Sequence, residues 1–127
     1  MQKPIRVLIV DDMQRARRSM RALLSTSPRF GEICEAGDGQ EAVQQVREFQ
    51  PDLVLMDIRM PGLNGLEATV QIKASWPYVK VIVLSMYTEY RDEALAAGAD
   101  AFASKAEASE GLLNLVSAVL QKGVQAD

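Results

Sequence analysis

The chain has 127 residues, which is enough for one domain with a full hydrophobic core. Its 14 Lys and Arg against 17 Asp and Glu give a net charge of -3, so the overall charge does not point to nucleic acid. No apolar run approaches the roughly 20 residues of a membrane span, and the single cysteine excludes an internal disulfide. We therefore expect a cytoplasmic protein with no membrane contact.

Apolar runs and amphipathic stretches alternate along the whole chain. The apolar runs predict five β-strands, over residues 5–10, 32–36, 53–57, 79–85 and 101–104. The stretches between them carry apolar residues at helical spacing and predict five helices, over residues 13–24, 38–50, 64–76, 88–97 and about 109–123. Residues 53–56 are apolar without a break, as in a strand that is covered on both faces.

Capping residues mark several of the helix ends. Asp38 with Glu41, and Asn64 with Glu67, have the spacing of a capping box. Thr88 is the expected cap of a short Ala-rich helix that Gly98 ends in a left-handed conformation, and Gly123 is expected to close the last helix. In the third helix the residues expected to face the core are Leu66, Val70 and Ile72.

Strict alternation of strands and helices with short connections predicts an α/β fold. The sheet is expected to be parallel, with right-handed crossovers and helices on both faces. No internal domain boundary is visible, so residues 1–123 form one expected domain and residues 124–127 a tail or the start of a linker.

Four of the predicted strands end on polar side chains that could take part in a reaction: Asp11 and Asp12, Asp57, Ser85 and Lys105. The carboxyl ends of parallel strands lie along one edge, so these residues are expected to meet in one crevice. Carboxylates crowded there favour a hard divalent cation such as Mg²⁺, and a lysine and a hydroxyl beside them suit phosphoryl oxygens. The group as a whole predicts phosphoryl transfer onto Asp57.

Each member of this group also has a plain structural interpretation. Asp11 and Asp12 alone would cap the first helix, Ser85 alone would be a turn residue, and Lys105 alone a surface lysine. The arginines of the first helix, Arg15, Arg17, Arg18 and Arg21, are by default a solvated face, with a docking surface for an acidic partner as the alternative. The joint placement at successive strand ends favours a functional site.

Four segments resemble the receiver domain of bacterial two-component response regulators. They are Ile9-Val10-Asp11-Asp12, Asp52-Leu53-Val54-Leu55-Met56-Asp57-Ile58-Arg59-Met60-Pro61-Gly62, Leu84-Ser85 and Gly98-Ala99-Asp100-Ala101-Phe102-Ala103-Ser104-Lys105. The resemblance covers nearly the whole chain. It implies a doubly wound, five-stranded parallel sheet in the flavodoxin-like order 2-1-3-4-5.

The resemblance also implies a role for each site residue. Asp57 would accept a phosphoryl group from a histidine kinase or a phosphotransfer protein. Mg²⁺ would be held by Asp12 directly, by Asp11 largely through water, by Asp57, and by the backbone carbonyl of Arg59. Ser85 and Lys105 would engage the phosphoryl oxygens, and Phe102 would be the aromatic switch that moves with Ser85. Such a domain catalyses only its own phosphorylation and dephosphorylation, so we do not expect a metabolic enzyme.

Two shorter segments resemble the NarL/FixJ subfamily, namely Met60-Pro61-Gly62-Leu63-Asn64-Gly65-Leu66-Glu67 and Leu84-Ser85-Met86. Members usually continue into a helix-turn-helix domain, which this sequence does not contain. The expected function is thus the regulatory half of a transcriptional response regulator, which contacts DNA only through an absent C-terminal domain and forms a homodimer on phosphorylation. The alternative is a stand-alone receiver that acts through protein–protein contacts.

Two other classes of protein use related folds. An aspartyl-phosphate phosphatase usually has a carboxylate two residues after the nucleophile, where this chain has Arg59. A flavodoxin-like cofactor binder would have a Ser/Thr/Gly-rich loop after the first strand, where this chain has Asp11-Asp12-Met13-Gln14-Arg15. Both departures favour the receiver.

Overall fold

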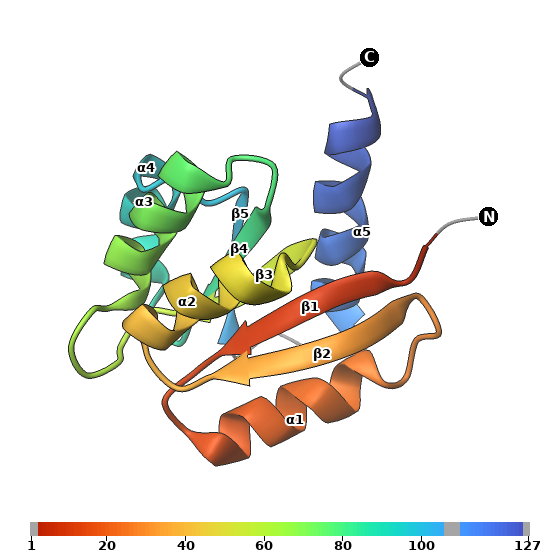
Figure 1. Cartoon of the computed structure of the whole chain (residues 1–127), viewed down its shortest axis with the longest axis horizontal. Coiled ribbons are helices and arrows are strands. Elements are labelled where there is room, and N and C mark those ends of the chain that lie inside the picture. Colours follow the sequence, from red (N-terminus) through yellow and green to blue (C-terminus); the bar gives the residue numbers. More distant parts are fainter. Residues whose placement is uncertain (1–2, 106–109, 126–127) are drawn as a thin grey trace.

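A computed structural model of the chain describes residues 3–105 and 110–125 (Figure 1). Its strands are β1 (Ile5–Val10), β2 (Phe30–Ala36), β3 (Leu53–Asp57), β4 (Lys80–Ser85) and β5 (Ala101–Ser104). Its helices are α1 (Gln14–Leu24), α2 (Gly39–Phe49), α3 (Gly65–Ser75), the 3₁₀ turn η1 (Thr88–Tyr90), α4 (Arg91–Ala96) and α5 (Glu110–Gln125). All five strands predicted from the sequence are present.

The strands form one parallel sheet in the order β2-β1-β3-β4-β5, as the resemblance implied. Helices α1 and α5 cover one face of the sheet, and α2, α3 and α4 cover the other (Figure 1). The fold is therefore the doubly wound, flavodoxin-like arrangement.

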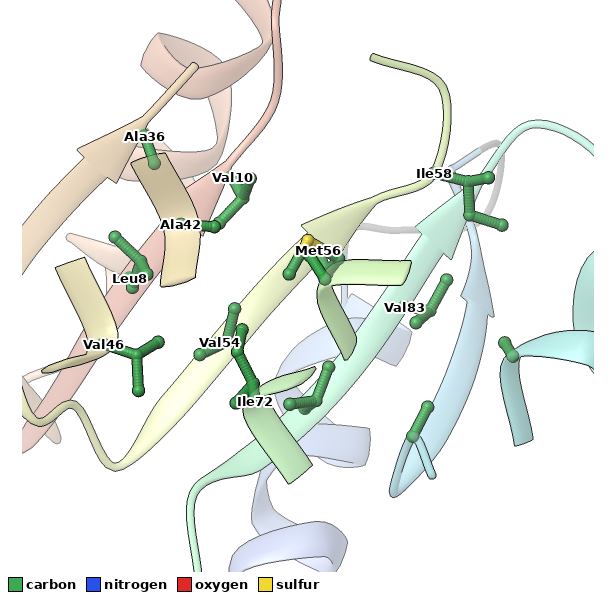
Figure 2. Packing of buried hydrophobic residues seen from close by; sticks show 14 of the residues in the cluster. Leu8, Val10, Ala36, Ala42, Val46, Val54, Met56, Ile58, Ile72 and Val83 are labelled. Carbon is green, nitrogen blue, oxygen red and sulfur yellow. The ribbon is translucent and has the colours of Figure 1, made fainter. Parts of the chain in front are cut away.

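Each face of the sheet carries its own hydrophobic cluster, because successive residues of a strand point to opposite faces. Leu8 and Val10 of β1 pack with Val46 of α2 in one cluster, which Figure 2 shows together with the facing residues of β3 and β4. Val7 and Ile9 pack instead against α1 and α5. Both sets are buried, which explains why these strands read as unbroken apolar runs rather than alternating ones.

The predicted caps are confirmed at three of the helix ends. Asn64 and Glu67 form a full capping box at the start of α3, with side-chain to backbone distances of 2.9 and 3.1 Å. Asp38 accepts a hydrogen bond from the Glu41 N–H at 2.8 Å. Gly98 has φ of +104°, so the second residue after α4 requires the conformational freedom of glycine.

Three local predictions are wrong. Thr88 makes no capping hydrogen bond; it lies inside η1, whose flanking cap is Tyr87. Val70 is 52% exposed, because α3 turns Gly65, Ala68, Thr69 and Ile72 toward the sheet. Gly123 does not close the last helix, since α5 continues to Gln125. The predicted helix start at residue 109 lies outside the described residues, which resume with α5 at Glu110.

Within the described ranges, no helix combines the length and the apolar character that crossing a membrane requires.

Candidate functional site

The β1–β3 pairing brings three carboxylates to one edge of the sheet. Val10 lies opposite Met56 in the register, so the next residues, Asp11 and Asp57, emerge side by side. Each of Asp11, Asp12 and Asp57 offers a carboxylate oxygen, and these oxygens lie within 4.8 Å of one another. Asp11 is buried, Asp57 is partly buried and Asp12 is exposed. The convergence predicted from the strand ends is thus present for these three carboxylates.

Lys105 reaches this group from the end of β5. Its Nζ lies 2.7 Å from Oδ2 of Asp11 and 3.1 Å from Oδ1 of Asp57. The ammonium therefore lies between two carboxylates that would otherwise repel each other. The plain interpretation of Lys105 as a surface lysine does not hold, because only 24% of its side chain is exposed.

The environment shifts the pKa values of both partners. Burial raises the pKa of the Asp57 carboxyl; Lys105 opposes this shift, and the nearby charge of Asp11 adds to it. Burial alone would lower the pKa of the Lys105 ammonium, but its hydrogen bond to Asp11 and the charge of Asp57 raise that pKa above its ordinary value. Lys105 is consequently charged at neutral pH, while the charge on Asp57 costs free energy in the folded state.

The charges of this group match a divalent cation. Three carboxylates and one ammonium leave two negative charges at the sheet edge. Oxygen ligands that are this close, with one of them exposed to solvent, suit Mg²⁺, which keeps part of its water shell. The described residues therefore fit the cation that the sequence predicts.

Ser85 and Phe102, the two predicted switch residues, lie on β4 and β5. Ser85 is 3% exposed, and its Oγ accepts a hydrogen bond from the Tyr87 N–H at 3.0 Å. Among the described residues, no hydrogen bond joins Ser85 to the carboxylates or to Lys105. Phe102 is buried in the α2–α4 side of the core, and the Arg91 guanidinium lies 5.3 Å from its ring centre.

Arg59 lies two residues after Asp57, and its guanidinium packs against two tyrosine rings. Its guanidinium lies 4.2 Å from the ring centre of Tyr87 and 5.9 Å from that of Tyr90. The two tyrosine rings meet edge to face, with their centres 6.4 Å apart. Arg59 and Tyr90 also line a cleft of about 460 Å³ that has Asp12 on its wall.

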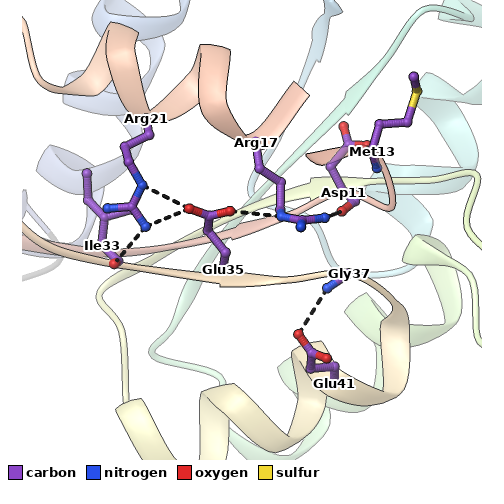
Figure 3. A network of polar contacts seen from close by, with 8 residues as sticks. All are labelled: Asp11, Met13, Arg17, Arg21, Ile33, Glu35, Gly37 and Glu41. Atoms are coloured by element: carbon purple, nitrogen blue, oxygen red, sulfur yellow. Dashed lines mark hydrogen bonds and ion pairs between the residues drawn. The ribbon is translucent and has the colours of Figure 1, made fainter. Parts of the chain in front are cut away.

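The arginines of α1 do not form one solvated face. Arg15 and Arg18 are exposed, but Arg17 and Arg21 both bind Glu35 of β2 (Figure 3). Burial alone would raise the pKa of the Glu35 carboxyl, but the hydrogen bonds and charges of Arg21 and Arg17 lower it below its ordinary value. This pairing could not be predicted from the sequence, because Glu35 lies in a separate strand and no spacing links it to α1.

If the carboxylates bind Mg²⁺, the cation should stabilise the folded chain. A ligand present at 100 times its dissociation constant adds about 2.7 kcal/mol to the free energy of unfolding. We expect MgCl₂ to raise the melting temperature of the wild-type chain, measured by circular dichroism, and to leave that of Asp12→Ala nearly unchanged. Asp12 is exposed and its side chain has no hydrogen bond or ion pair among the described residues, so the metal-free variant should fold normally.

The control for that experiment is Glu48→Ala, which removes an exposed carboxylate from α2. Glu48→Ala should respond to MgCl₂ as the wild type does. If MgCl₂ raised the melting temperature of Asp12→Ala as much as that of the wild type, the cation would bind elsewhere.

Comparison with known proteins agrees with this geometry. The response regulator receiver domain family matches residues 7–117. The transcriptional regulatory protein DegU of Brevibacillus brevis is 36% identical over 121 residues, which are 94% of this chain and 51% of DegU. The chain belongs to the response regulator receiver family.

Two solved structures resemble the whole fold. A two-component response regulator of the LuxR family from Aurantimonas superposes with a TM-score of 0.89 at 30% identity, over 94% of this chain and 87% of that one. The response regulator TrrA of Thermotoga maritima, solved in complex with Mg(2+)-BeF, has a TM-score of 0.83 at 32% identity, over 91% of this chain and 98% of that one. DegU and the LuxR-family structure place the chain in the NarL/FixJ, or LuxR-type, subfamily. The chain spans about half the length of the curated relatives it matches.

Proposed function

We propose that the chain is a phosphorylation-dependent signalling switch in which Asp57 accepts a phosphoryl group in the presence of Mg²⁺. The observation that carries this proposal is the contact of Lys105 with both Asp11 and Asp57, beside the exposed carboxylate of Asp12. A carboxylate nucleophile, a lysine and a divalent-cation site are the groups that phosphoryl transfer to a carboxylate requires.

Asp57, Lys105 and Asp11 would have different roles in the transfer. A carboxylate oxygen of Asp57 forms a bond to phosphorus as the bond from phosphorus to the donor breaks, and the electron pair leaves with the donor. Lys105 stays charged and neutralises part of the negative charge on the incoming group. Bound Mg²⁺ would supply further charge neutralisation at the phosphoryl oxygens. Asp11 holds Lys105 in place through the 2.7 Å contact.

The proposed donor is a histidine kinase or a phosphotransfer protein, as the family implies. Phosphorylation would draw Ser85 toward Asp57 and move the segment around Phe102, and the changed surface would favour a homodimer. DegU is a transcriptional regulator and the Aurantimonas structure is of the LuxR family, which supports a role in transcription with DNA contact made outside residues 1–127. We further propose a cytoplasmic location and no turnover of a metabolite.

Phosphorylation by a small donor tests this function directly. Incubation with acetyl phosphate and MgCl₂ should add one phosphoryl group to the intact chain, as measured by mass spectrometry. Fragmentation should place the group on the peptide that contains Asp57, and EDTA should prevent the addition. A chain that stays unmodified with excess donor and Mg²⁺, or a label that maps to another peptide, would overturn the proposal.

A further inference from the structure

Two arginines of α1, Arg17 and Arg21, share one carboxylate of β2. Nε of Arg17 donates to Oε1 of Glu35 at 2.8 Å, and Nε of Arg21 donates to Oε2 of the same residue at 2.9 Å (Figure 3). Only 19% of the Arg17 side chain and 28% of the Glu35 side chain are exposed. A partly buried pair of this kind holds its geometry better than an exposed one, because solvent screens it less.

The two arginines differ in the second group that each one binds. Nη1 of Arg17 donates to the backbone carbonyl of Asp11 at 2.6 Å. Nη2 of Arg21 donates to the carbonyl of Ile33, which lies in β2 itself, at 3.3 Å. Both arginines link α1 to Glu35 of β2, but only Arg17 also holds the segment between β1 and α1; the second acceptor of Arg21 lies in β2.

The carbonyl that Arg17 binds belongs to the peptide bond between Asp11 and Asp12. The backbone N–H of Asp11 is also bound, since it donates to the carbonyl of Ala36 at 3.1 Å. Both oxygens of the Asp11 carboxylate have partners as well: the Met13 N–H at 3.0 Å and Lys105 at 2.7 Å. The orientation of the peptide between Asp11 and Asp12 determines where the carboxylate of Asp12 lies. Among the described residues, the Asp12 side chain makes no hydrogen bond or ion pair that would fix it independently.

We propose that Arg17 is a positioning residue for the divalent-cation site. Anchored by Glu35, its guanidinium holds the Asp11–Asp12 peptide in the orientation that presents both carboxylates toward Asp57. This inference rests on the proposed function, because it concerns the Mg²⁺ that phosphoryl transfer to Asp57 requires. Outer residues that orient metal ligands typically change metal affinity 10- to 100-fold when they are replaced.

A purely structural role for Arg17, as a link between α1 and β2, makes a different prediction. Arg21 makes the same link through the same carboxylate, so replacing either arginine should then have similar effects. A lysine keeps the charge but not the planar fork that reaches two acceptors at once. Arg17→Lys and Arg21→Lys are thus matched changes, and they differ mainly in the bond to Asp11.

The test is the Mg²⁺ affinity of the unphosphorylated full chain, measured by isothermal titration calorimetry. We expect Arg17→Lys to weaken Mg²⁺ binding about tenfold and Arg21→Lys to stay within about twofold of the wild type. In labelling with acetyl phosphate, Arg17→Lys should need more Mg²⁺ for half-maximal rate but reach the wild-type rate at saturation. A general loss of structure would lower the saturated rate as well.

Equal affinities of the two lysine variants, with normal binding by the wild type, would overturn this inference and leave the proposed function intact. If the wild type does not bind Mg²⁺ at all, both proposals fail. Should Arg17→Lys not fold, Glu35→Gln replaces it, since the amide keeps the shape of the side chain but weakens the anchor of Arg17. Undiminished affinity in Glu35→Gln would then overturn the inference.

Discussion

Asp57→Asn should abolish phosphoryl uptake from acetyl phosphate. The amide has nearly the shape of the carboxylate, but it is neutral and offers no nucleophilic oxygen of comparable strength. The substitution also removes one of the three negative charges at the sheet edge, which weakens the site for a divalent cation. We expect no detectable label by intact-mass spectrometry, and a circular dichroism spectrum that matches the wild type.

The matched control for Asp57→Asn is Asp52→Asn. Asp52 lies just before the other end of β3, where its Oδ2 accepts a hydrogen bond from the Arg6 N–H at 2.9 Å, and an asparagine oxygen can accept the same bond. This variant should be labelled to the wild-type extent. Persistent labelling of Asp57→Asn would exclude Asp57 as the acceptor, whichever peptide carried the label.

Gly65→Ala should destabilise the fold strongly. A Cβ at Gly65 would lie 1.8 Å from the carbonyl oxygen of Asp57 and 2.9 Å from the Cα of Ile58. Both neighbours are backbone atoms, so no side-chain rotation can relieve the clash, and the start of α3 must move away from the end of β3. Forcing extra volume into a close-packed region typically costs about 1–3 kcal/mol, and we expect about 3 kcal/mol or more here.

Urea denaturation of Gly65→Ala alongside Gly111→Ala measures this effect. Gly111 lies in α5 and a Cβ there meets nothing within 4 Å, so alanine should be neutral or add up to about 1 kcal/mol through its helix propensity. Because the clash involves the backbone of Asp57, the proposed acceptor, we also expect Gly65→Ala to be labelled more slowly. Similar stabilities of the two glycine variants would contradict the close contact between α3 and β3.

Regular features of the fold could be predicted from the sequence because each has a local cause. Unbroken apolar runs marked the strands, and Asn64 with Glu67 marked the start of α3 by spacing alone. The errors occurred where a neighbouring element decides the outcome. Val70 is as apolar as Ile72, yet only Ile72 is buried, because the close approach of α3 to Asp57 sets which side of the helix faces the sheet.

The candidate site could likewise be predicted only in part. The sequence alone places Asp11, Asp57 and Lys105 together, since strand ends in a parallel sheet share one edge. The contacts of Arg17 could not be anticipated, because the implied strand order places β2 beside β1 but nothing in the sequence shows that Glu35 points toward α1. Arg59 and Tyr87 are 28 positions apart, and their contact likewise depends on how two loops meet above the sheet.

The position of β1 between β2 and β3 also has a consequence for how the chain is made. On a ribosome, β1 can pair with β2 once residue 36 has emerged, but its other edge must wait for β3, which begins at Leu53. Until then Val7–Val10 present an apolar strand with open backbone groups, which is the kind of edge that associates with other chains. Parallel pairing across a crossover is slow because it closes a long loop. A pause when the chain has emerged to a point between residues 36 and 53 should therefore promote aggregation more than a pause after residue 85 has emerged, when β1, β3 and β4 are all available.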